Sequence, residues 1–258
     1  LTYGTISHRT VFQEATKKRD LIKYNNKNFA KSINSFLSRL HWRSHFIQKL
    51  EDQPSIEHTS FIPVYDQIRD KDEEKLEAWI EGKTGVHFID ACMIYLRNYG
   101  WINFRMRAML VSFASYNLWL DWRSTSKYLS KYFLDYEPGI HYNQFQMQSG
   151  VTGINSIRIY NPVKQQSDHD PDGTFVRRWC PELRSVPNEY LQYPHLMSET
   201  FQKKIGCIIG KDYSRPVVDI KLSALKAKKI IYSIKSTSKA KQMSQDAYLL
   251  HGSRRKRK

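Results

Sequence analysis

The fold of this chain is indicated most clearly by the stretch GWINFRMRAMLVSFASYNLWLDWRSTSKYLSKYFLDYEPGIHYNQFQMQ, from Gly100 to Gln148. Apolar residues recur in it at steps of three and four, which is typical of amphipathic helices. One helical segment carries Arg107, and Asp135 follows further along the stretch. A buried arginine needs a carboxylate partner, because an unpaired charge is costly in an apolar interior. We therefore predict that Arg107 pairs with Asp135, which the residues alone explain as a plain salt bridge between helices.

Helical patterns continue on both sides of this stretch. Further helices are expected at 10–19, 29–50, 86–96 and 222–232, and loops with short helices at 150–195. Gly100 marks the end of one helix, and Pro138 with Gly139 is expected to break another. No segment shows sustained strand alternation, and no internal repeat is visible. The sequence therefore predicts an all-α, multi-helical fold.

Charge is distributed unevenly along the 258 residues, whose formal net charge is +16. From residue 201 onward there are 16 Lys/Arg against three Asp, a balance of +13, which leaves +3 for the first 200. A basic tail ending in RRKRK, Arg254 to Lys258, favours polyanionic partners, although a solvated tail explains it equally well. We predict a helical domain at 1–196 and a basic extension at 197–258. The absence of a long apolar run and of a leader predicts an intracellular protein without membrane contact.

Three short motifs do not predict catalytic or metal sites. Gly82-Lys83-Thr84 lacks the first glycine of a phosphate-binding loop, and the His41/His45 pair lacks a glutamate and a third ligand. The alternating aspartates at 168–172 lack the closing glutamate of a calcium loop. Three scattered cysteines indicate reduced thiols rather than disulfides or zinc. No metal is predicted.

The stretch from 78 to 178 resembles the helical FAD-binding domain of the photolyase/cryptochrome family, and the resemblance extends from Leu1 to about His195. It implies FAD as cofactor, DNA as partner and a monomeric protein. Because the family's phosphate-binding loop and α/β antenna domain have no counterpart before Leu1, we expect that they are missing here and that an antenna domain or chromophore lies upstream.

Residue by residue, the resemblance implies a cofactor site. Arg43 matches an arginine on the FAD phosphates, and Arg107 with Asp135 matches a pair that tunes the flavin. His141 takes the position facing flavin N5, where it could supply a proton. The implied cofactor-binding residues are Phe36, Arg39, Arg43, Trp101, Phe104, Arg107, Asp135, Glu137, Ile140 and His141.

The same resemblance implies catalytic and DNA-contacting residues. Trp122 matches the middle member of an electron-relaying tryptophan chain, and together with His141 it forms the expected catalytic set. Trp42 matches an aromatic residue beside the DNA lesion, and Arg105 and Met147 complete the expected DNA contacts.

Several positions depart from the family pattern. Arg39 replaces a glutamate that contacts the lesion, and Phe104 replaces an asparagine. Phe145 and Arg69 replace the inner and outer tryptophans of the relay, and Ala108 replaces the Met or His that distinguishes repair types. The (6-4) repair mechanism is therefore not supported.

Three functions follow from these matches and departures. The leading expectation is blue-light-driven electron transfer to pyrimidine dimers in DNA, which would make the protein a deoxyribodipyrimidine photo-lyase. The second is a cryptochrome-like photosensor without repair activity. The third is a flavin-free domain that binds nucleic acid.

Overall fold

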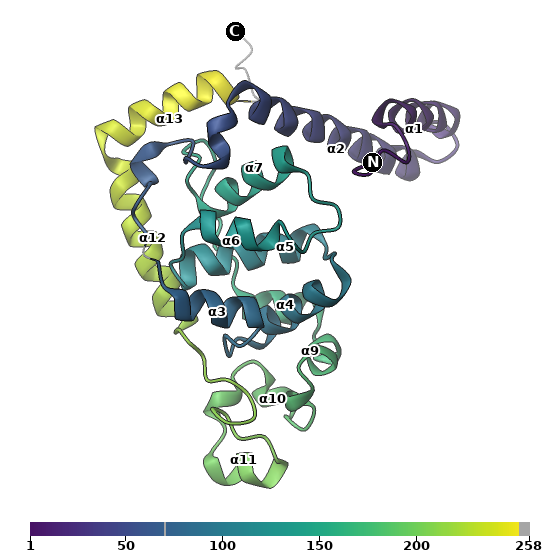
Figure 1. Cartoon of the computed structure of the whole chain (residues 1–258). Coiled ribbons are helices and arrows are strands. Elements are labelled where there is room, and N and C mark those ends of the chain that lie inside the picture. Colours follow the sequence, from purple (N-terminus) through teal and green to yellow (C-terminus); the bar gives the residue numbers. More distant parts are fainter. Residues whose placement is uncertain (70, 253–258) are drawn as a thin grey trace. The chain divides into compact units, whose positions relative to one another are not determined.

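The chain folds into helices joined by turns and loops (Figure 1). In this computed structural model the described residues are 1–69 and 71–252. Within them there is no named β-strand, and the isolated bridge between Ile209 and Tyr213 is the sole strand-like pairing. The predicted all-α fold is confirmed. The described residues divide into two compact units, one of residues 1–58 and 135–143 and one of 59–69, 71–134 and 144–252.

The first unit is built on a helical hairpin, α1 (His8–Ile22) and α2 (Lys27–Asp52). Ser7 and Asn26 cap the two helices by accepting hydrogen bonds from backbone N–H groups of the first turn. Between the helices lies a small apolar core, made of Val11, Phe12, Ala15, Ile22, Ile33, Leu37 and Leu40. This core fixes one face of α2 toward α1, and Phe36 and Trp42 on other sides of α2 stay exposed.

The second unit contains most of the buried core. Its first helices are α3 (Glu73–Glu81), α4 (His87–Tyr99), α5 (Phe104–Ser112) and α6 (Trp122–Leu129). The later ones are α8 (Pro162–His169), α9 (Thr174–Trp179), α10 (Asn188–Leu191), α11 (Glu199–Ile205), α12 (Ile220–Ser236) and α13 (Ser238–His251). Helix α4 is central, because it packs against α3, α5, α8 and α9, and its Ile89, Met93 and Leu96 are fully buried.

Two helix boundaries show how glycine and proline act at the ends of helices. Gly100 ends α4 in the left-handed conformation, at φ 66°, and a Cβ there would lie 2.5 Å from the Leu134 side chain. The predicted stop is therefore confirmed. Pro138, by contrast, does not break a helix: it is the first residue of α7 (Pro138–Ser149). The expectation was wrong because proline lacks an N–H, which costs nothing in the first turn of a helix.

A π-helical segment, η3 (Phe113–Asn117), follows α5 directly. Its five residues are buried, and Trp119 just beyond it adopts a left-handed backbone conformation, at φ 59°. The Trp119 indole N–H donates to the Ile68 carbonyl at 3.0 Å, which holds the ring in place. Short 3-10 turns connect other elements, at Pro54–Glu57 (η1), Pro63–Tyr65 (η2), Pro181–Leu183 (η4) and Pro194–Leu196 (η5).

The C-terminal part contains more helix than the sequence predicted. The expected helix at 222–232 lies within α12, but α11 and α13 were not expected. Helix α12 packs against η3 and α13. The predicted basic terminus at Arg254–Lys258 lies outside the described residues, and the division expected at residue 196 stays a prediction. In the part of the chain that the structure describes, no helix is both long and apolar enough to cross a membrane.

Candidate functional site

One face of α2 presents an aromatic ring and two guanidinium groups. Phe36, Arg39 and Arg43 follow one another at steps of three and four, so they lie on the same side of the helix. Phe36 is 45% exposed, Arg39 is exposed, and Arg43 is half-buried. Trp42, expected at the DNA, is also exposed, and its ring lies 5.7 Å from that of Phe46. This face thus offers a stacking surface beside positive charge.

Arg43 is paired with a carboxylate from the start of α7. Its Nη2 donates to Glu137 Oε2 at 3.0 Å, and both side chains are partly exposed. Among the described residues, this is the hydrogen bond that Arg43 makes, so its Nε and Nη1 groups keep their donors available. The backbone allows this approach because Gly139 sits against α2, where a Cβ would lie 2.7 Å from the Ile47 Cα.

His141 is buried between two tyrosines of the same unit. Its ring centroid lies 5.0 Å from that of Tyr136 and 5.4 Å from that of Tyr142, with both pairs edge-on. Tyr136 donates to the Tyr142 hydroxyl at 3.4 Å, and Tyr142 donates to Glu57 Oε1 at 3.0 Å. Burial and these hydrogen bonds raise the pKa of Tyr142. The sequence patterns did not predict this tyrosine–carboxylate contact, because η1 and α7 are far apart in the chain.

The N-terminal turn of α5 forms a second set of candidate residues. Asn103 caps the helix, Trp101 is 50% and Phe104 is 63% exposed, and Arg105 is exposed. The Arg107 Nε donates to the Ile102 carbonyl at 2.6 Å. Its guanidinium carbon lies 4.3 Å from the Phe133 ring centroid and 6.0 Å from that of Trp101.

The structure does not test the predicted pairing of Arg107 with Asp135. Arg107 belongs to the second unit and Asp135 to the first. The contacts of Arg107 within its own unit show that its guanidinium is oriented by rings and a backbone carbonyl. The pairing therefore stays a prediction. The remaining expected residues are half-buried, Ile140 in the first unit and Met147 in the second.

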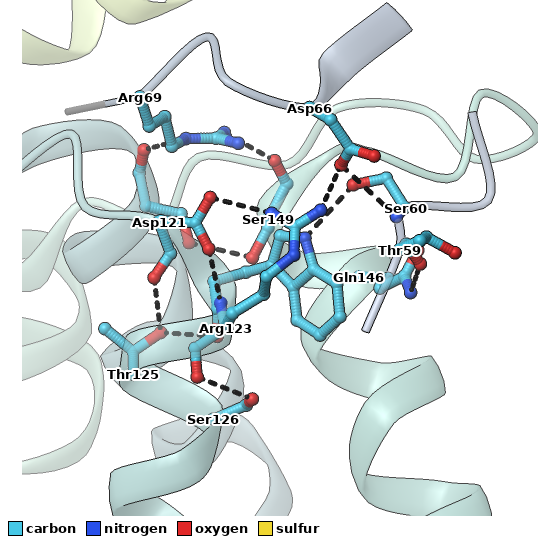
Figure 2. A network of polar contacts seen from close by, with 12 residues as sticks. Thr59, Ser60, Asp66, Arg69, Asp121, Arg123, Thr125, Ser126, Gln146 and Ser149 are labelled. Carbon is cyan, nitrogen blue, oxygen red and sulfur yellow. Dashed lines mark hydrogen bonds and ion pairs between the residues drawn. The ribbon is translucent and has the colours of Figure 1, made fainter. Parts of the chain in front are cut away.

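A polar network that includes Ser60, Asp66 and Arg123 lies at the start of α6 (Figure 2). Trp122, the first residue of α6, belongs to this network. The ring is almost fully buried, and its indole N–H donates to Ser60 Oγ at 3.1 Å. Arg123 extends across the Trp122 ring, 4.9 Å from its centroid, and pairs with both Asp121 and Asp66. Asp66 in turn accepts from the Ser60 N–H. These contacts hold the indole in one orientation.

Arg69 is buried beside this network without forming an ion pair among the described residues (Figure 2). Its Nε donates to the Ser115 carbonyl at 2.9 Å and its Nη2 to the Ser149 carbonyl at 2.7 Å. The rings of Tyr116 and Trp119 complete its surroundings. Burial lowers the pKa of Arg69 to about 10, so it remains charged at neutral pH.

The exposed groups fit a planar ligand that carries phosphates. In the first unit, Phe36 keeps a large ring surface open to solvent, which suits stacking. The remaining donors of Arg43 suit a phosphate, because guanidinium binds phosphate oxygens through paired hydrogen bonds. A flavin nucleotide combines both features. By contrast, no group of three or more potential metal ligands occurs in residues 1–69 and 71–252.

Comparison with known proteins identifies the family. The model for the FAD-binding domain of DNA photolyase matches residues 36–233. A deoxyribodipyrimidine photo-lyase of Alkalihalophilus pseudofirmus is 33% identical over 73% of this chain and 40% of its own length. Cryptochrome DASH of Synechocystis is 30% identical over 89% of this chain and 46% of its own. This chain thus spans less than half the length of these relatives.

Solved structures agree with this assignment. A bacterial class III photolyase from Agrobacterium tumefaciens superposes with a TM-score of 0.79 at 27% identity, over 92% of this chain and 48% of that one. The expected cofactor, FAD, is the one that defines the matched domain. Because the family match covers most of the chain and the structural likeness nearly all of it, the chain belongs to the family of photolyase and cryptochrome FAD-binding domains.

Proposed function

We propose that this domain binds FAD and uses blue light to transfer an electron to pyrimidine dimers in DNA. The observation that carries the proposal is the cation–aromatic surface at the start of α5, where Arg107 is held by Phe133 and Trp101 while Trp101 and Phe104 stay exposed. Bound FAD supplies one-electron chemistry. Two proteins similar to this chain carry the name photolyase, which supports the choice of reaction.

Each residue then has a defined role. Arg43, oriented by Glu137, binds phosphate oxygens of the cofactor. Arg107 stabilises negative charge on the flavin ring, because an oriented cation next to a developing charge needs little reorganisation. His141 holds a proton for the flavin, and its packing between Tyr136 and Tyr142 fixes the plane of the imidazole.

The proposed DNA contacts are Trp42, Arg105 and Met147. Trp42 and Arg105 are exposed, so a ring for stacking and a cation for phosphate are available to an incoming strand. Met147 is half-buried, and its flexible thioether can follow an irregular surface.

The test is a repair assay with the whole chain loaded with FAD. A thymine-rich oligonucleotide is irradiated with ultraviolet light, and dimers are counted after incubation in blue light or in the dark. We expect dimers to disappear in blue light alone. Retention of all dimers by a protein that demonstrably binds FAD and DNA contradicts the proposal.

A second candidate is a photosensor without repair activity. Phe145 is buried, and Arg69 is anchored to two carbonyls, so neither expected relay position offers an easily oxidised ring. The departures at Arg39 and Phe104 point the same way. A light-induced change in the flavin spectrum without dimer loss favours this candidate. A preparation that takes up no flavin favours the nucleic-acid-binding alternative.

A further inference from the structure

A run of lysines occupies α12 and the first turn of α13. Between Ile220 and Lys241 there are seven lysines and no aspartate or glutamate. The lysines are Lys221, Lys226, Lys228, Lys229, Lys235, Lys239 and Lys241. All but the half-exposed Lys235 are exposed, and none of them forms an ion pair within the described residues. Lysine runs this free of acids are unusual, because protein surfaces normally intersperse both signs.

The opposite face of α12 fixes the lysines in space. Ala227 and Ile231 are fully buried, and α12 packs against the π-helical segment. The Asn117 side-chain amide donates to the Ile220 carbonyl at 3.0 Å and to Ser223 Oγ at 2.9 Å. Helix α12 is therefore anchored along its apolar side, and its lysine side is a defined surface.

The lysines have a regular arrangement on that surface. Lys221, Lys228 and Lys235 recur every seven residues, so they form a row with a spacing of about 10.5 Å along the helix. Lys226 and Lys229 lie one turn apart, a spacing at which like charges repel. A partner that supplies negative charge along the length of the helix would relieve this repulsion and stabilise the helix.

The shape and charge of this partner can be inferred. Helix α12 has 17 residues and is therefore about 25 Å long. Duplex DNA carries one negative charge per about 1.7 Å of its axis, so an aligned duplex carries about 15 phosphates on its two strands over this length, and part of them faces the row. A membrane-bound helix needs a continuous free apolar face, whereas the exposed apolar residues of α12 are interspersed with lysines.

We propose that α12 and the first turn of α13 form a lesion-independent binding surface for the phosphate backbone of duplex DNA. The exposed side chains Leu222, Leu225 and Tyr232 lie among the lysines and can contact the sugars. This surface goes beyond the proposed repair function, because it requires neither flavin nor light nor damage. It would hold the protein on DNA between encounters with lesions.

The test compares two quadruple variants of the whole chain on undamaged duplex DNA in the dark. The first combines Lys221→Gln, Lys226→Gln, Lys228→Gln and Lys229→Gln. The matched control combines Lys127→Gln, Lys131→Gln, Lys164→Gln and Lys203→Gln, four exposed lysines outside α12 and α13. Both sets remove four charges and keep good helix formers, and circular dichroism verifies folding. Affinity is measured over a range of salt concentrations.

We expect the α12 variant to lose about tenfold or more in affinity at low salt, and its slope of log K against log salt to fall by about 2 to 4, while the control changes little. Equal effects of the two variants, or no effect of the first, would overturn the proposal. The proposal would also be overturned if the α12 variant lost binding to phosphatidylserine vesicles while its DNA binding stayed unchanged, because this result would identify a membrane surface. Because this binding test uses neither a lesion nor light, its result can be interpreted even if the repair assay fails.

Discussion

The surroundings of Asp90 make the stability of the fold depend on the protonation of one side chain. Its carboxylate is fully buried in the second unit and accepts from the Thr84 hydroxyl, the Thr84 and Gly85 N–H groups and the Tyr213 hydroxyl. Desolvation outweighs these four donors and raises the pKa of Asp90 to about 6. The contact joins residues 123 positions apart, so it ties the C-terminal part to the start of α4.

We predict a pH-dependent effect of Asp90→Asn. Because the folded pKa lies above the unfolded one, the wild type loses stability as pH rises from about 4 through 6. Asparagine removes this titration but leaves the Gly85 N–H without an acceptor, which costs about 1–3 kcal/mol. The deficit of the variant, measured by urea unfolding, should be largest near pH 4.5 and smaller above pH 7. A deficit that does not vary with pH contradicts this account.

Arg107 gives a second prediction at the residue scale. If its guanidinium stabilises reduced flavin, Arg107→Gln should make the midpoint potential of bound FAD more negative by about 60 mV, the equivalent of a tenfold change in relative affinity for a one-electron step. Arg105→Gln removes the same charge from an exposed neighbour and serves as the control. Equal shifts in the two variants would indicate a general effect of charge. Potentials are read by spectroelectrochemistry.

At the scale of elements, the contact between α12 and the π-helical segment η3 is the feature that fixes the C-terminal part. Ile231 is the fully buried centre of the α12 face. Ile231→Ala should therefore lower the free energy of unfolding by about 2–5 kcal/mol, because the vacated volume cannot collapse fully. Leu225→Ala, on the exposed side of the same helix, should change it by about 0.5 kcal/mol or less. Denaturant unfolding measures both, and similar losses would mean that α12 does not dock through Ile231.

At the scale of the whole molecule, cofactor binding should raise stability. At a free FAD concentration of 100 times its dissociation constant, the free energy of unfolding rises by about 2.7 kcal/mol, which for a chain of this size shifts Tm by about 5–10 °C. Riboflavin, which lacks phosphates, provides the matched ligand. Arg43→Gln should reduce the FAD shift and leave the riboflavin shift unchanged. If both shifts fall equally, Arg43 acts on folding rather than on phosphate.

Several features of the fold could be predicted from local sequence. Apolar residues at steps of three and four indicated α2, α4 and α5, and Gly100 indicated where α4 ends. Periodicity fails where it is interrupted: Pro138 suggests a break but starts α7, and the apolar residues of α13 are too sparse to predict a helix. Helical periodicity is a local property, so a helix can be predicted from its own residues without knowledge of the rest of the chain.

The amino-acid sequence alone indicates the all-α class, the main helices and, through its motifs, the family. Which distant groups meet follows from the way the helices pack. Arg43 and Glu137 are 94 residues apart and still form an ion pair, Arg69 is held by two carbonyls rather than a carboxylate, and Asp90 receives the Tyr213 hydroxyl. Such contacts depend on how helices pack, which no periodicity encodes, because burial and hydrogen bonding are properties of the assembled interior.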